Sequence, residues 1–219
     1  MGSHEIIDIY LRRILSIILL LIVLLPVATA QVTGNNVRLH GRALQYASHH
    51  IEVFVYKDYI TRDKVAIGVI DIDDNGKFDC VVDLQREGVR YAFLELGAYK
   101  AYIYLESGKT YQIVLPPFKQ RPDADRFNPF YQQELIEIGI VNEASKLNIS
   151  IRGFESWWHN MYAENISRLA RYNDRKLADK LILQCDSIEK VINCSSPFFH
   201  DFVHYRKAQV YATPRMGDV

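Results

Sequence analysis

The chain has 219 residues, and its 26 lysines and arginines are balanced by 26 aspartates and glutamates. A chain of this length can bury a core as one domain or as two small ones. The charge balance argues against binding to nucleic acid or to an anionic membrane surface, because both require a basic patch.

The first thirty residues have the three parts of a secretory signal peptide. A pair of arginines precedes an apolar run over residues 14–25, which is too short to span a bilayer comfortably. Small residues at positions 28 and 30 predict cleavage between Ala30 and Gln31. We therefore expect an exported protein of the periplasm or cell envelope. An uncleaved membrane anchor is the alternative, and this segment would then be the only attachment to a membrane.

Composition divides the mature chain into a β-rich first half and a helical second half. Seven of the eleven glycines lie between Gly34 and Gly108, and nine of the fourteen tyrosines lie between Tyr46 and Tyr131, which is typical of strands joined by turns. We predict four segments: a signal peptide over 1–30, a β-sandwich domain over 31–115, a proline-containing connection over 116–142 and a helical segment over 143–219.

Short alternating apolar runs predict the strands of the first half. In one of these runs Ile51, Val53 and Val55 share a face, and in the middle of the domain Asn75 and Gly76 suit a tight hairpin turn. Turns recur near every ten residues, as in a sandwich or barrel. We predict an antiparallel β-sandwich of about seven to eight strands, at 37–44, 51–56, 65–71, 77–84, 91–96, 101–105 and 110–115, with a possible extra strand over 136–140.

The apolar period changes to that of a helix from residue 143 onward. Leu147, Ile151, Phe154 and Trp158 recur every three or four residues, which predicts a first helix with one buried stripe. We expect a second helix over 174–191 and a third that begins near Pro197. The fold class is therefore α+β, a sandwich followed by three helices.

Three cysteines remain in the mature chain, and their environment after export permits a disulfide. Cys185 and Cys194 are the natural pair. One straight helix over both would separate them by about 13 Å, which is too far to bridge, so a bridge requires the helix to end before Cys194. Three buried free thiols are the alternative. The chain has no Cys-x-x-Cys sequence, so it lacks the motif of thiol–disulfide catalysis.

His200 and His204 lie four residues apart, a spacing that places both imidazoles on one helix face and suits a metal ion. Asp201 stands where zinc peptidases carry a glutamate, and its side chain is shorter. A surface helix with two incidental histidines is the alternative interpretation. No catalytic constellation or cofactor motif can be identified elsewhere, so we predict no cofactor.

Segments 37–41, 51–56, 73–78, 91–96 and 106–111 carry a resemblance to a known family. They resemble a β-sandwich domain of unknown function that occurs near the N-terminus of exported Bacteroidetes proteins. Segments 128–131, 197–202 and 205–206 are similar to helical regions that follow such domains. The similarity rests on turn and core residues of the predicted strands and helices. In many of those proteins the domain precedes a thioredoxin-like thiol:disulfide interchange domain, which is missing from this chain. The resemblance therefore implies the sandwich fold but carries over no redox function and no site residue.

These observations favour a non-catalytic interaction or accessory module of the envelope or periplasm. Its partner would be another envelope protein, or a C-terminal domain of its own if the chain is a truncated version of a longer protein. A carbohydrate- or peptide-binding module that uses exposed tyrosine or tryptophan side chains is the alternative. A metal-dependent hydrolase built on His200 and His204 is the weaker alternative.

Overall fold

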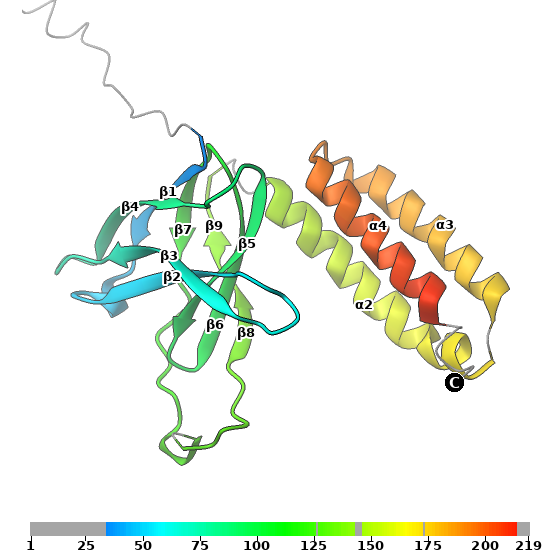
Figure 1. Ribbon diagram of the computed structural model, residues 1–219, viewed down its shortest axis with the longest axis horizontal. Helices are drawn as coiled ribbons and strands as arrows, with labels where there is room; N and C mark the ends of the chain where they lie inside the picture. The colour runs from blue at the N-terminus through cyan, green and yellow to red at the C-terminus, as the bar shows by residue number, and fades with distance from the viewer. Residues whose placement is uncertain (1–33, 126, 143–145, 173, 214–219) are drawn as a thin grey trace, which may run out of the picture. The chain divides into compact units, whose positions relative to one another are not determined.

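The computed structural model describes residues 34–125, 127–142, 146–172 and 174–213 (Figure 1). The predicted signal peptide and its cleavage point between Ala30 and Gln31 lie outside the described residues. Within the described part, no helix combines the length and the apolar character needed to cross a membrane.

The first half folds into two β-sheets that bury a common core (Figure 1). All seven strands predicted in this half are present, with ends within two residues of the prediction. The four-stranded sheet has the order β4 (Lys77–Asp83), β1 (Asn36–Arg42), β7 (Thr110–Val114) and β9 (Gly139–Ile140). The five-stranded sheet has the order β3 (Lys64–Asp71), β2 (His50–Tyr56), β5 (Val89–Leu96), β6 (Tyr99–Glu106) and β8 (Glu134–Glu137).

Both sheets are mixed, so the prediction of a purely antiparallel arrangement was wrong. β1 pairs with β7 in parallel, and β6 pairs with β8 in parallel. A parallel pair requires a long connection between its strands, since a tight hairpin can only reverse the chain. The chain between β6 and β8 contains β7 and the short 3₁₀ helix η2 (Asp123–Asp125), and the chain between β1 and β7 contains β2 to β6.

The extra strand expected over 136–140 is two strands, one in each sheet. β8 ends at Glu137 on the edge of the five-stranded sheet, and β9 begins at Gly139 on the edge of the four-stranded sheet. Ile138, between them, is buried in the common core. The alternation seen in the sequence is therefore real, but one segment serves both sheets.

The predicted strand patterns place the expected side chains inside. Ile51, Val53 and Val55 are all buried in the common core. The turn at Gly76 adopts a positive φ of 76°, and a Cβ there would lie 2.5 Å from the Cα of Leu44, in the 3₁₀ helix η1 (Leu44–Tyr46). Only glycine fits such a conformation without strain.

Three helices follow the sheets and lie side by side (Figure 1). They are α2 (Lys146–Tyr172), α3 (Arg175–Ile192) and α4 (Pro197–Ala212). Asp174 caps α3 by accepting a hydrogen bond from the Leu177 N–H, and Asn193 ends it in the left-handed conformation. The predicted apolar stripe of α2 is buried in a second core that the three helices share.

Two asparagine side chains continue the sheet ladders where strands end. β8 leaves the sheet after Glu137, so the next backbone groups of β6, those of Tyr104, have no strand beside them. The side chain of Asn148, on α2, takes that place: its Oδ1 accepts from the Tyr104 N–H and its Nδ2 donates to the Tyr104 C=O, both at 2.9 Å. Asn142 does the same for β7, accepting from the Gln112 N–H and donating to the Thr110 C=O.

We predict that Asn148→Ala lowers the free energy of unfolding by about 2–4 kcal/mol. Asn148 is only 2% exposed, so its removal leaves the N–H and C=O of Tyr104 without a partner at a buried position. Urea denaturation measures the change. Asn160→Ala, at an exposed position of the same helix, is the control and is expected to change the free energy by no more than about 0.5 kcal/mol. Equal effects of the two substitutions would contradict the role given to the Asn148 amide.

Candidate functional site

The outer face of the five-stranded sheet carries a group of aromatic side chains instead of the usual polar ones. These residues alternate along β2, β5 and β6 with the residues of the core, so they point away from it. Antiparallel pairing places Tyr91 opposite Tyr104 and Phe93 opposite both Phe54 and Tyr102. We call this surface the tyrosine face; it consists of Phe54, Tyr56, Tyr91, Phe93, Tyr102 and Tyr104.

The rings of the tyrosine face pack mainly against one another. Tyr56 and Tyr91 are stacked with 6.2 Å between ring centroids and 6° between planes, and Tyr91 and Tyr102 are stacked at 5.5 Å and 19°. Tyr104 meets Tyr91 edge to face at 5.4 Å. Such contacts stabilise a fixed ring arrangement. They also cover much of the flat surface of the stacked rings, so the ring edges and hydroxyl groups are what a ligand would meet.

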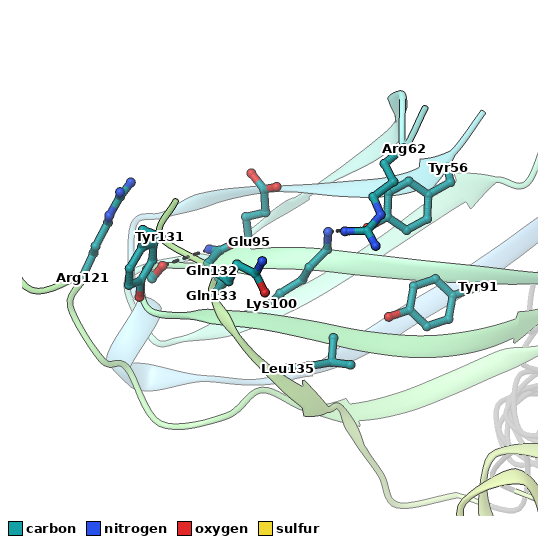
Figure 2. Close-up of a pocket in the computed structure, with 11 residues that line it drawn as sticks. Tyr56, Arg62, Tyr91, Glu95, Lys100, Arg121, Tyr131, Gln132, Gln133 and Leu135 are labelled. Atoms are coloured by element: carbon teal, nitrogen blue, oxygen red, sulfur yellow. Dashed lines mark hydrogen bonds between the residues drawn. The ribbon is translucent and has the colours of Figure 1, made fainter. Parts of the chain in front are cut away.

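A cavity of about 560 Å³ lies at one end of the tyrosine face (Figure 2). Tyr56 and Tyr91 line it, and residues of the β2–β3 loop and the β7–β8 connection complete its wall. Lys100 donates a hydrogen bond to the Tyr56 hydroxyl, and its Nζ lies 4.0 Å from the centroid of the Phe93 ring. The other lining residues are Arg62, Glu95, Gly97, Arg121, Tyr131, Gln132, Gln133 and Leu135.

A second cavity, of about 470 Å³, lies at the other end of the tyrosine face, where α2 and α4 approach the sheet. It shares Tyr91 and Leu135 with the first cavity, so the two adjoin. Tyr104 contacts Phe198 of α4 on this side, with ring centroids 5.7 Å apart. The remaining wall consists of Tyr102, Glu137, Asn148, Ile151, Arg152, Glu155, Ser156, His159 and Arg206.

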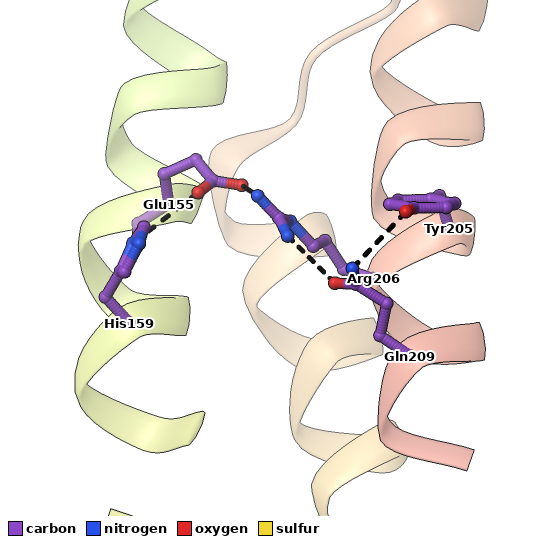
Figure 3. A network of polar contacts seen from close by, with 5 residues as sticks. All are labelled: Glu155, His159, Tyr205, Arg206 and Gln209. Carbon is purple, nitrogen blue, oxygen red and sulfur yellow. Dashed lines mark hydrogen bonds and ion pairs between the residues drawn. The ribbon is translucent and has the colours of Figure 1, made fainter. Parts of the chain in front are cut away.

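The charges of the second cavity are paired with each other (Figure 3). The Arg206 guanidinium binds Glu155 through Nε at 2.7 Å and Nη2 at 2.6 Å, and it also donates to Gln209 at 2.8 Å. Arg152 forms an ion pair with Glu137 at 3.3 Å. This cavity therefore has two cations and two carboxylates in its wall, with each carboxylate bound to an arginine.

Burial raises the pKa of three tyrosines of the face, Tyr91, Tyr102 and Tyr104. It raises the pKa of Tyr104 to about 12 and raises the pKa of Tyr91 well above its usual value. It also raises the pKa of Glu137, although the neighbouring Arg152 acts in the opposite direction. At neutral pH the tyrosines are therefore hydroxyl groups that can both donate and accept hydrogen bonds.

The two histidines considered as metal ligands lie on α4, away from the tyrosine face. His200 Nδ1 lies 2.6 Å from a Glu189 carboxylate oxygen, and the His204 side chain is exposed. Among the residues that the structure describes, no group of three or more histidine, cysteine, aspartate or glutamate side chains could hold a metal ion. The structure thus brings no third ligand to this pair within the described part.

The three cysteines are free thiols in the structure. α3 ends at Ile192, so the helix does stop before Cys194, which was the geometric condition for a bridge to Cys185. The Cys185 side chain is buried among the helices, and burial raises the pKa of its thiol to about 11. That thiol is therefore protonated and poorly nucleophilic near neutral pH.

The interpretation of the sequence did not identify the tyrosine face. The signal was present in the strand patterns, since Tyr56, Tyr91, Tyr102 and Tyr104 occupy the positions that alternate with the core. In a sheet with one solvated face, such positions are usually polar. A large aromatic residue at several of them marks a surface that something else covers.

Comparison with protein-family models, with curated proteins and with solved structures finds no match to this chain. The resemblance to a domain of exported Bacteroidetes proteins therefore stays a hypothesis.

We predict that Tyr104→Phe weakens the dependence of stability on alkaline pH. The pKa of Tyr104 is about 12 in the folded chain and near 10 when exposed, so folding favours the neutral hydroxyl. Its contribution to stability is complete below pH 10 and is lost as the pH rises from 10 to 12. Urea denaturation at pH 9, 10 and 11 should show a shallower loss for the variant. Parallel curves for variant and wild type would contradict the burial of this hydroxyl.

Proposed function

We propose that this chain is a non-catalytic interaction module of the periplasm or cell envelope that docks another protein on its tyrosine face. The observation that carries the proposal is the continuous aromatic surface on the outside of the sheet, with an adjoining cavity at each end. Phe93 is buried within this surface and the other five rings are partly exposed. Partly exposed aromatic side chains beside cavities are typical of binding sites.

The composition of the site favours a protein as the ligand. Tyrosine and arginine are enriched at the centres of protein interfaces, because tyrosine offers a large, amphipathic contact with few rotatable bonds and arginine offers several donors. Both residue types line both cavities. A carbohydrate ligand usually stacks on a flat aromatic face, whereas here Tyr91 is stacked between Tyr56 and Tyr102, and Trp158 is buried in the helical core.

The carboxylates of the site support binding over catalysis. Glu95 is paired with Lys64 at 2.7 Å, Glu137 with Arg152 and Glu155 with Arg206. A general acid or base must be able to exchange a proton with its substrate at the working pH. Carboxylates that are already bonded to cations suit a structural or docking role.

Export is the first part of the proposal to test. When the full chain is expressed in a Gram-negative host, we expect the product recovered from the periplasm to begin at Gln31, since cleavage follows Ala30. Mass spectrometry and N-terminal sequencing measure this directly. Ala30→Arg, which removes the small residue before the cleavage point, is expected to leave the segment attached. An uncleaved wild-type chain in the cytoplasm would overturn the proposed location.

Site-directed photo-crosslinking tests the docking surface. A benzoylphenylalanine in place of Tyr91, where the two cavities meet, should link the chain to a discrete envelope protein. The same replacement at Val81, which is 57% exposed on β4 of the other sheet, is the matched control and should not. The linked protein, once purified, should bind the wild type and bind Tyr102→Ala about tenfold or more weakly, as expected for an interface tyrosine.

Three outcomes of the crosslinking and affinity measurements would oppose the proposal. No linked protein at Tyr91 would remove the docking function. Equal linking at Tyr91 and Val81, or an unchanged affinity of Tyr102→Ala, would show that proteins do not dock on the tyrosine face.

A further inference from the structure

We propose that the segment docked on the tyrosine face is an extended acidic peptide whose carboxylates bind Arg62, Lys100 and Arg121. This inference rests on the proposed function and adds the chemistry of the partner. It follows from how the charges in the two cavities are distributed.

Three cations line the first cavity, and none of them has a carboxylate partner among the described residues. Arg62, in the β2–β3 loop, has no hydrogen bond or ion pair to any residue that the structure describes. Lys100 donates only to the Tyr56 hydroxyl. Arg121 donates to the backbone carbonyls of Asp125 and Asn128, while its buried Nε has no partner in the described part of the chain.

The one carboxylate in the wall of the first cavity does not neutralise these cations. Glu95 is bound to Lys64, which is outside the lining. The chain as a whole has no net charge, and the adjoining second cavity has its arginines matched by glutamates. The positive charge of the first cavity is therefore local, and it selects an anionic ligand.

The neighbouring groups fit carboxylates carried on a peptide. The Tyr91 hydroxyl can donate to a carboxylate oxygen, and the Arg121 guanidinium carbon lies 4.3 Å from the centroid of the Tyr131 ring. Figure 2 shows Arg62 and Lys100 beside Tyr56, with Arg121 beside Tyr131 farther along the sheet. Cationic groups thus stand at two separate places along the cavity, as an extended segment with several acidic residues requires.

An apolar position between the cavities separates a peptide from other anions. Leu135, on the edge strand β8, is 59% exposed and belongs to the wall of both cavities. An extended peptide can place an apolar side chain against Leu135 and Tyr91 while its acidic neighbours reach the cations. An acidic sugar chain has no such side chain, so it would leave the apolar surface of Leu135 exposed to water.

Selection from a displayed library of random twelve-residue peptides tests the inference. The mature protein is immobilised, and enriched peptides are then measured for affinity by fluorescence anisotropy. We expect the enriched peptides to carry aspartate or glutamate next to a large apolar residue. We expect their Kd to rise by about tenfold or more in the double variant Arg62→Gln with Lys100→Gln, which removes two of the three cations.

Matched variants distinguish the effect of a cation in this cavity from the effect of the net charge of the protein. Arg175→Gln with Lys176→Gln makes the same change of charge at exposed positions of α3 and should leave the Kd unchanged. Lys100 also covers the Phe93 ring, so the single variant Arg62→Gln, which removes no contact to a described residue, guards against an effect of misfolding. By itself, Arg62→Gln should raise the Kd several fold, and this increase should be smaller at high salt.

The outcomes distinguish this inference from the proposed function. Enriched peptides that compete with the photo-crosslinked partner but carry no excess of acidic residues would overturn the acidic assignment and leave the docking surface in place. An equal loss of affinity in the α3 control would overturn it as well. Binding of oligogalacturonate with the same dependence on Arg62 and Lys100, and without selection of acidic peptides, would assign the site to an acidic sugar and overturn the peptide.

Discussion

The segment that passes from β8 through Ile138 to β9 is the constraint on which the rest of the structure depends. It closes an edge of each sheet and inserts Ile138 into the core between them. Each edge then ends on an asparagine amide, Asn142 on β7 and Asn148 on β6, which satisfies backbone groups that a departing strand leaves unpaired. Because Asn148 belongs to α2, the same two hydrogen bonds that complete the sheet also attach the helical segment to it.

This attachment gives the tyrosine face its two different ends. At the end held by Asn148, the helices bring Arg152, Glu155 and Arg206 to the sheet, and these charges are satisfied by one another or by Glu137. At the other end, strands and loops together form the wall, and three cations there, on β6 and on two loops, face a cavity without matching carboxylates. A surface that is neutral at one end and positive at the other can orient an extended partner as well as hold it. Electrostatic complementarity of this kind contributes more to orientation and selectivity than to raw affinity.

The strand patterns were reliable where burial on one side imposes alternation. Val53 and Val55 had to face the core, so the position of β2 could be derived from the sequence. The direction of pairing could not be derived, because a parallel and an antiparallel neighbour bury the same residues. The division of 136–140 into two strands was equally hidden: Ile136, Ile138 and Ile140 alternate as a single strand would, and only the presence of two sheet edges separates them. The interpretation of His200 and His204 as metal ligands rested on their spacing alone, which carries no information about a third ligand.

The sequence by itself determined the elements of this protein: seven strands, the turn at Gly76 and three helices, each of which follows from local periodicity and backbone preference. It also contained the aromatic residues of the tyrosine face, at the positions that alternate with the core. Only the tertiary structure decided that β2, β5 and β6 place these rings side by side, and that Arg62 and Arg121, 59 positions apart in the numbering, line one cavity. The physical reason is that periodicity acts over a few residues, whereas a binding surface is assembled by strand order, and strand order depends on how the whole chain buries its core.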